Sequence, residues 1–175
     1  MSALIRLATA ADAAALSGLA RRAFQETFVD GFQLPYTPSD LATFLQGYAP
    51  EKTARWISDA RAHVLVAEDA GGSLVAYAHA GDNALPVPVG DGDGSGAGEL
   101  KRLYVLRSAQ GAGLGKALLE RSLAWLGARR VYIGVWSGNN KAQRLYSHYG
   151  FAVVGGYKYV VGDTFDDEYI MARDG

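Results

Sequence analysis

The sequence predicts a single α/β domain over 1–175, built on one mixed sheet with helices on both faces. Three observations support this prediction. A chain of 175 residues most often forms one domain, since domains average roughly 150 residues. Apolar residues make up 49% of the chain and charged residues 20%, as in ordinary globular proteins. Segments follow in the order one strand, two or three helices, three strands, helix, strand, helix and two strands.

The N-terminal third is expected to be mostly helical after a short strand over 5–7. Thr9 followed by Asp12 matches a helix N-cap with an acidic third residue. Thr37-Pro38 matches a second cap with proline at the first helical position, and a third helix is expected to begin at Pro50. The apolar residues at helical spacing after the first cap are Leu16, Leu19, Ala20, Ala23 and Phe24.

The rest of the chain is expected to alternate between strands and helices. The expected strands cover 63–68, 73–80, 100–106, 131–135, 151–161 and 165–172. Helices are expected over 114–127 and over a segment that ends at Gly150. Two prolines and a cluster of glycine and aspartate predict an exposed loop over 81–98. Within it, 91–96 imitates half of a calcium loop, but Arg102 replaces the glutamate at its twelfth position, so no metal is expected.

Composition and charge exclude several classes of function. The absence of cysteine excludes disulfides, thiolate metal sites and a cysteine nucleophile. The net charge of -1 argues against a broad nucleic-acid-binding surface. No stretch approaches the ~20 apolar residues of a membrane-spanning helix, and Asp12 interrupts the apolar core that a signal peptide would need. His63, His79 and His148 lack metal-ligand spacing. A cytoplasmic location without nucleic-acid or membrane partners is therefore expected.

The most informative segment is the glycine-rich turn Gln110–Lys116, between an expected strand and an expected helix. Glycines let the backbone approach a ligand closely, and the free N–H groups of a helix start bind anions. A Walker A loop needs glycine in place of Gln110 and serine or threonine in place of Ala117. The Rossmann fingerprint needs a third glycine in place of Lys116. Neither nucleotide-binding loop fits this segment.

Two motifs together resemble one enzyme family. The first is Gln-x-x-Gly-x-Gly after Leu103-Tyr104-Val105. The second, Asn-x-x-Ala-x-x-x-Tyr-x-x-x-Gly-Phe, consists here of Asn139, Ala142, Tyr146 and Gly150-Phe151. The combination resembles the GCN5-related N-acetyltransferase (GNAT) family, closely over 99–151 and more loosely elsewhere. The stretch 161–171 is also similar to the PaiA branch of this family, which acts on spermidine and spermine.

The resemblance implies a GNAT-like fold with a mixed, mostly antiparallel sheet of about six to seven strands. It implies that the glycine-rich turn holds the pyrophosphate of acetyl-CoA, without a metal ion. It also implies that the fourth and fifth strands splay apart, which frees the Val105 N–H to stabilise an oxyanion. The residues implied to bind acetyl-CoA are Leu103, Tyr104, Val105, Gln110, Gly111, Ala112, Gly113, Leu114, Gly115, Lys116, Asn139, Ala142 and Tyr146.

Acetyl transfer from a thioester to an amine needs a base for the amine and benefits from an acid for the thiolate. Tyr146 matches the family's thiolate-protonating tyrosine, and a phenol of pKa ~10 suits that role. Glu99, six residues before Val105, matches the general base of the histone-acetylating branch, acting through water. Other branches place the base where this chain has Gly134, which cannot serve. Direct transfer fits the absence of cysteine, although a serine nucleophile would fit it equally.

The expected function is acetylation of a small cationic amine, with polyamines as the leading substrates. Acetylation of a protein N-terminus or lysine, and a non-catalytic acyl-CoA sensor, stay open as alternatives. Charge is unevenly distributed: 99–144 carries a net +7, whereas 1–98 carries -5 and 145–175 carries -3. The acidic residues that would attract an amine, or equally guard an edge strand, are Asp163, Asp166, Asp167 and Glu168. Homodimers are frequent in such families, so a homodimer is expected.

Overall fold

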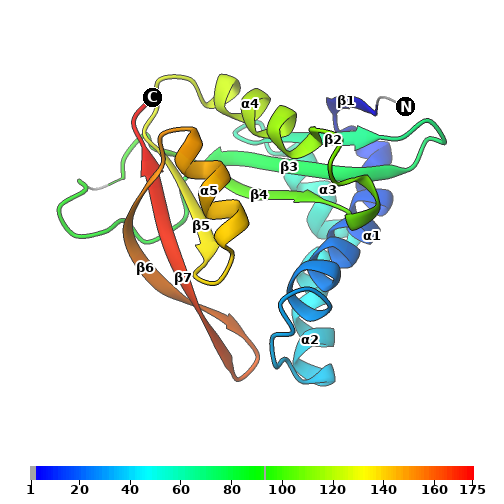
Figure 1. Cartoon of the computed structure of the whole chain (residues 1–175). Coiled ribbons are helices and arrows are strands. Elements are labelled where there is room, and N and C mark those ends of the chain that lie inside the picture. Colours follow the sequence, from blue (N-terminus) through cyan, green and yellow to red (C-terminus); the bar gives the residue numbers. More distant parts are fainter. Residues whose placement is uncertain (1–2, 93) are drawn as a thin grey trace.

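The computed structural model describes residues 3–92 and 94–175, and over these residues the chain forms one sheet of seven strands. Only β4 and β5 pair in parallel within this described part, and the other neighbours are antiparallel (Figure 1). In order across the sheet, the strands are β1 (Leu4–Leu7), β2 (His63–Glu68), β3 (Leu74–Asp82), β4 (Gly98–Val105), β5 (Val131–Trp136), β7 (Thr164–Arg173) and β6 (Ala152–Val161). The predicted mixed, mostly antiparallel sheet is confirmed.

Helices cover both faces of the sheet, as the sequence predicts. The α-helices are α1 (Ala13–Phe24), α2 (Pro38–Leu45), α3 (Pro50–Ser58), α4 (Leu114–Leu126) and α5 (Asn140–His148). Leu16 of α1 packs in one core with Val66 of β2, whereas Leu118 of α4 packs in a second core with Leu65. Because neighbouring strand residues point to opposite faces, α1 to α3 cover one face and α4 and α5 the other (Figure 1).

The contacts that the sequence indicates are present at the predicted ends of the helices. The N–H of Thr9 donates to Asp12 Oδ2 at 2.7 Å, which forms the capping box before α1. Thr37 Oγ1 accepts from the N–H of Asp40 at 3.2 Å, at the start of α2. After α5, Gly150 has a φ of +85°, the left-handed conformation that glycine adopts most readily.

The loop predicted over 81–98 is shorter and less exposed than expected. β3 runs to Asp82 and β4 begins at Gly98, two residues before the predicted start, so the loop covers 83–97. Ala97 is buried, and Leu85 packs beside it against Ile170 of β7. The apolar residues at both ends of the loop therefore tie it to the sheet.

In the segment that imitates half of a calcium loop, Asp91 makes contacts within the protein. The Asp91 carboxylate forms an ion pair with Arg130 at 2.6 Å and accepts the Tyr132 hydroxyl at 2.5 Å. Asp93 lies outside the described residues. Within the described part of the chain, no group of three or more potential metal ligands lies together, and no helix is long and apolar enough to span a membrane.

An unexpected π-helix, Gln25–Val29, continues α1 toward α2. Such wide turns are rare and are frequently found at functional sites. Aromatic rings connect the π-helix to the sheet: Phe28 of the π-helix lies 6.1 Å from Phe32, and Phe32 lies 4.6 Å from Trp136 at the end of β5. The α1–α2 connection thereby closes one side of the space beyond β4 and β5.

The parallel pair of strands opens along its length. Gly98 pairs with Val131 and Glu99 with Tyr132, and beyond these two pairs β4 and β5 separate (Figure 1). β5 pairs along its whole length with β7 instead. The divergence leaves one edge of β4 without a neighbouring strand over its second half, as the resemblance implies.

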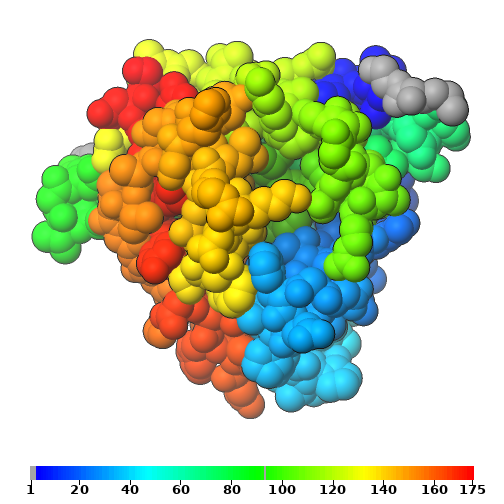
Figure 2. Space-filling view, viewed as in Figure 1, coloured from blue at the N-terminus to red at the C-terminus, as the bar shows by residue number. Residues whose placement is uncertain are grey.

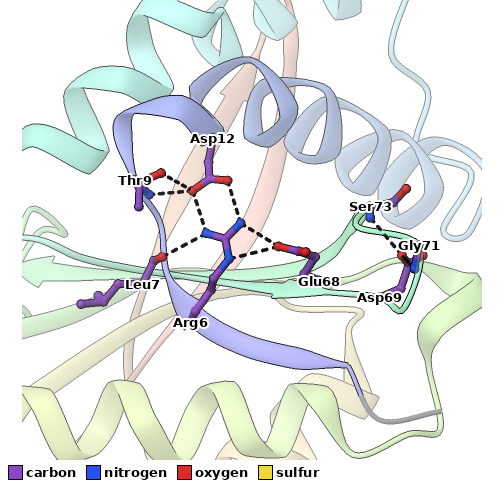
Figure 3. Close-up of polar contacts among 8 residues, drawn as sticks. All are labelled: Arg6, Leu7, Thr9, Asp12, Glu68, Asp69, Gly71 and Ser73. Carbon is purple, nitrogen blue, oxygen red and sulfur yellow. Dashed lines mark hydrogen bonds and ion pairs between the residues drawn. The ribbon is translucent and has the colours of Figure 1, made fainter.

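At the edge of the sheet formed by β1, Arg6 joins three elements (Figure 3). Its guanidinium donates to both oxygens of Asp12, at 2.8 and 2.9 Å, and to Glu68 Oε2 at 2.8 Å. Asp12 precedes α1 and Glu68 ends β2, so the cluster fastens β1 to a strand and to a helix start. None of these three residues lines the cavity described next.

Candidate active site

A cavity of about 960 Å³ occupies the space where β4 and β5 diverge. Figure 2 shows the surface hollowed between the lime-green atoms before α4, the yellow-orange atoms of β5 and α5, and the blue atoms after α1. We call the part lined by the turn Gln110–Lys116 the turn end. We call the part lined by the β6–β7 hairpin residues Tyr157, Tyr159, Asp166 and Glu168 the hairpin end.

The turn end presents unpaired main-chain groups to the cavity. Gly111 and Gly113 have φ values of +86° and +77°, which residues with a side chain adopt at a cost. Gly113 is the N-cap of α4, and no side chain caps that helix. The first N–H groups of a 13-residue helix are thus free to bind an anion. Arg107, Lys116 and Lys141 add positive charge along this part of the wall.

The exposed edge of β4 adds a second main-chain surface. The N–H of Leu106 donates to Val75 O on β3 at 2.9 Å. Because successive residues of a strand point their N–H groups to opposite sides, the N–H of Val105 points away from β3, into the gap before β5. The Val105 carbonyl points the same way and accepts Gln110 Nε2 at 3.2 Å. These groups fit an extended, amide-bearing chain such as pantetheine.

Of the residues predicted to bind acetyl-CoA, all but Ala112 line the cavity. Ala112 is exposed at the tip of the turn, where its side chain points to solvent rather than to the cavity. Asn139 lines the cavity but also has a structural task, since its Oδ1 accepts the N–H of Ala142 at 3.1 Å and caps α5. A hydrogen bond from Asn139 to a ligand would therefore have to come from its Nδ2.

Tyr146 lies where the two strands diverge, on the face of α5 that points to the cavity. The side chain is 7% exposed and packs edge-on against Phe151, with 6.1 Å between ring centroids. Burial raises the pKa of Tyr146, and the negative charge of Glu168 adds to the increase. The phenol therefore keeps its proton at neutral pH and can donate it.

Glu99 lies at the last paired position between β4 and β5 and lines the cavity. It is 7% exposed, and its Oε2 accepts the N–H of Ala84 at 2.8 Å and Lys101 Nζ at 3.0 Å. These two contacts connect the 83–97 loop to β4. Both contacts use Oε2, so Oε1 is the oxygen that could accept a proton while the two contacts are kept.

The hairpin end contains a pair of carboxyl groups to which the sequence assigns no catalytic role. Asp166 and Glu168 alternate along β7, so they share the face that points to the cavity. Asp166 accepts a hydrogen bond from the Tyr36 hydroxyl. Burial, with a smaller contribution from Asp166, raises the pKa of Glu168 to about 7, although the Tyr157 hydroxyl opposes the shift. Glu168 is thus poised to exchange a proton near neutral pH.

Because successive residues of a strand point to opposite faces, Asp166 and Glu168 lie on the other face of β7 from Asp167. Asp163 and Asp167 are exposed, and Asp167 pairs with Lys158 on the outer face of the hairpin. Only a prediction of register could show that Asp166 and Glu168 face inward. The structure also gives a steric reason for glycine at residue 134, because a Cβ there would lie 2.6 Å from the Tyr157 hydroxyl. The missing side chain leaves room for this phenol.

The histidines are placed away from proton-transfer positions. His148 is exposed, and His63 stacks on Trp125 with 5.0 Å between ring centroids. His79 is buried and contacts Arg102, and burial, reinforced by Arg102, lowers its pKa to about 3. Each therefore has the structural or solvated environment that the sequence predicts.

Comparisons with known proteins agree with this geometry. Residues 14–151 match the acetyltransferase (GNAT) family. An uncharacterized N-acetyltransferase of Mycobacterium tuberculosis is 31% identical over 144 residues, which cover 78% of this chain and 83% of the relative. The PaiA N-acetyltransferase of Thermoplasma acidophilum, solved with coenzyme A, superposes with a TM-score of 0.75 at 21% identity, over 100% of both chains.

A second solved structure, yncA of Salmonella typhimurium with its cofactor acetyl-CoA, has a TM-score of 0.65 at 25% identity. It covers 99% of this chain and 94% of its own. The family match spans most of the chain, and the sheet, the divergent strands and the glycine-rich turn all follow the GNAT arrangement. The chain therefore belongs to the acetyltransferase (GNAT) family and is an acetyl-CoA-dependent N-acetyltransferase.

Proposed function

We propose that the protein transfers an acetyl group directly from acetyl-CoA to a small primary amine that arrives as a cation, with polyamines as the first acceptors to consider. One observation carries the proposal: Glu168, whose pKa is raised to about 7, lines the same cavity as the free start of α4. A carboxylate with that pKa attracts an ammonium ion and can also take its proton. The PaiA neighbour in the structural comparison supports the choice of polyamines.

The residues at the turn end would hold the coenzyme, which supplies an activated acetyl group. Main-chain N–H groups at Gly113 and the start of α4 would bind its phosphates, assisted by Lys116. The edge of β4 would bind its amide-bearing arm. The Val105 N–H points into the gap and would donate a hydrogen bond to the acetyl carbonyl.

In this proposal Glu168 accepts the proton of the amine. Protonation of its carboxylate costs little free energy at neutral pH, because burial already disfavours the charged form. Asp166 stays beside it, held by Tyr36, and keeps the hairpin end attractive to cations. Glu99, which the resemblance implies as base, stays the alternative candidate, since it lines the same cavity.

Tyr146 acts as the acid for the departing thiolate. It lines the cavity beside Asn139 and Ala142, and burial keeps its hydroxyl protonated. No hydrogen bond within 3–92 and 94–175 engages the hydroxyl, so its proton is available to a ligand. This assigns the acid to α5 and the base to β7, on two different walls of the cavity.

The test is acetyl-CoA turnover with a panel of amines: spermidine, spermine, lysine and a short peptide with a free N-terminus. Thiol release gives the rate, and mass spectrometry identifies the acetylated product. We expect faster turnover with the small amines than with the peptide. A clear preference for the peptide would replace the proposal by protein acetylation. Coenzyme binding without thiol release for any amine would favour the acyl-CoA sensor.

The cytoplasmic location and the homodimer belong to the same proposal as predictions. Fractionation of cells would test the location. Light scattering of the purified protein at several concentrations would test the homodimer, and a constant mass of 18.6 kDa would contradict it.

A further inference from the structure

Arg102 brings a positive charge to the aromatic wall of the cavity. Its side chain leaves β4 on the face covered by α1 and α3, and it lines the cavity. The guanidinium carbon lies 4.3 Å from the ring centre of Trp56 and 5.8 Å from that of Tyr48. Nη1 lies 3.2 Å from His79 Nδ1. Two rings and an imidazole therefore hold this cation in a fixed place.

Among the described residues, no carboxylate forms an ion pair with this cation. None of the ion pairs formed by residues 3–92 and 94–175 includes Arg102. By contrast, Arg6 and Arg130 each bind two carboxylates. His79 is neutral, since burial lowers its pKa to about 3, so it offers an acceptor but no counter-charge. A guanidinium has five N–H donors, and no ion pair within the described residues gives any of those of Arg102 an anionic partner.

Arg102 lines the same cavity as Asp166 and Glu168, the two carboxylates of the hairpin end. Both signs of charge act on Tyr159: burial raises the pKa of Tyr159, Arg102 opposes the increase, and Glu168 and Asp166 add to it. All four residues line the same cavity. The cavity therefore presents one fixed positive group, Arg102, and the two carboxylates of the hairpin end to whatever enters it.

We propose that Arg102 binds a carboxylate of the acceptor, so that the acceptor is a small amine that also carries a carboxylate, of the amino-acid class. The proposal rests on the proposed transfer to a small cationic amine, and it replaces polyamines by amino acids as the first acceptors to consider. A charge removed from water without a partner is unfavourable, and a planar guanidinium matches a carboxylate through two parallel hydrogen bonds. The ammonium group would lie toward Glu168 and the carboxylate toward Arg102.

A polyamine would satisfy only half of this arrangement. Its ammonium groups would suit Asp166 and Glu168, but a second cation in the cavity would face the guanidinium of Arg102. Like charges at close range repel, and the repulsion grows where water is excluded. An amino-acid acceptor instead pairs both signs of charge with groups that the cavity already holds.

The test compares acceptors that differ only in the carboxylate: lysine against cadaverine, and ornithine against putrescine. For the wild-type protein we expect kcat/KM to be at least about tenfold higher for each amino acid than for its diamine. The Arg102→Gln variant is expected to reduce this ratio to about one, mainly through KM for the amino acid. Arg102→Lys keeps the charge and should retain part of the preference.

Two measurements keep the result interpretable. Thermal unfolding and coenzyme affinity of each variant establish that the fold and the turn end are intact, and calorimetric binding of lysine to the wild-type protein gives a readout independent of the variants. Equal kcat/KM for amino acid and diamine, a higher value for spermidine, or a loss in Arg102→Gln that is equal for both acceptors would overturn the proposal. None of these three results would contradict the proposed acetyl transfer itself. Failure to acetylate any amine would instead contradict the proposed function.

Discussion

The turn end of the cavity is made mainly of main-chain groups, whereas the hairpin end is made of side chains. At the turn end, Gly111, Gly113 and the edge of β4 offer N–H and C=O groups from one short stretch of chain. The side chains of the hairpin end share the cavity with Tyr36 and Arg102, which come from segments far apart in the sequence. The first arrangement suits a ligand that is the same in every reaction. The second can change its specificity by single substitutions.

This difference predicts that substitutions at the two ends affect different constants. Changes at the turn end should alter affinity for the coenzyme and leave acceptor preference alone. Changes at the hairpin end should alter kcat and acceptor preference and leave coenzyme affinity alone. Tyr146 lies between the two ends, so it should affect the chemical step without affecting either affinity.

The largest effect is expected for Glu168→Gln. Removing the base should lower kcat/KM for the amine by about 1000-fold at pH 8, within the range of general-base catalysis. Because the pKa of Glu168 is raised to about 7, wild-type kcat/KM should fall as the pH drops below about 7, where the carboxylate becomes protonated. The variant should lose this dependence. The measurement is kcat/KM from pH 5.5 to 9 at saturating acetyl-CoA.

Glu99→Gln is the matched comparison, because it makes the same chemical change at the glutamate of the cavity that is the alternative candidate for the base. If Glu168 is the base, Glu99→Gln keeps the fall of kcat/KM below pH 7 and shows a small loss that is uniform with pH. The reverse result, in which Glu99→Gln loses the pH dependence and Glu168→Gln keeps it, would make Glu99 the base.

Tyr146→Phe should have the next largest effect. Loss of the hydroxyl proton is expected to lower kcat by about 100-fold, with little change in coenzyme affinity, because the ring still packs on Phe151. Tyr149→Phe provides the control, since the Tyr149 hydroxyl binds Glu120 away from the cavity. Steady-state kinetics and calorimetric titration with coenzyme A measure the two quantities. Equal kcat for both variants would remove Tyr146 as the acid.

Gly113→Ala should weaken coenzyme binding by about tenfold and leave acceptor preference unchanged. A Cβ at this residue meets no protein atom within 4 Å, but its φ of +77° strains an alanine by roughly 1–2 kcal/mol. Gly127→Ala is the control, since Gly127 has a φ of +66° at the other end of α4, outside the cavity. Both variants should lose stability, measured by urea unfolding. Similar coenzyme dissociation constants for the two would contradict a phosphate site at Gly113.

The same division explains what could be predicted from the sequence. The turn end could be predicted because its groups are contiguous, and glycine at 111 and 113 marks the backbone geometry directly. Glu168 and Arg102 could not be recognised, since their roles depend on which face of a strand is buried and on partners far along the chain. The π-helix at 25–29 could not be predicted, because the helical spacing of α1 gives no sign of a wider turn. Ala112 belongs to the predicted binding residues only because it lies within the motif.

The smallest effect on activity is expected for Asp12→Ala, which lies outside both ends of the cavity. The variant loses the ion pair with Arg6 at 2.8 Å and the hydrogen bond that Asp12 accepts from the N–H of Thr9, the N-cap residue. We expect the free energy of unfolding to fall by about 1–3 kcal/mol, while kcat per folded molecule stays within twofold of wild type. Asp163→Ala, at an exposed turn residue, should change stability by less than about 0.5 kcal/mol.

The pH dependence of this loss has a definite sign. Hydrogen bonding to Arg6 holds the pKa of Asp12 well below its usual range. A depressed pKa stabilises the fold above the unfolded-state pKa of about 4, and that contribution disappears as the pH falls further. Wild type and Asp12→Ala should therefore differ by a constant amount from pH 8 to about pH 5 and converge only in stronger acid. A fall in kcat that parallels the loss of stability would instead couple this edge of the sheet to the cavity.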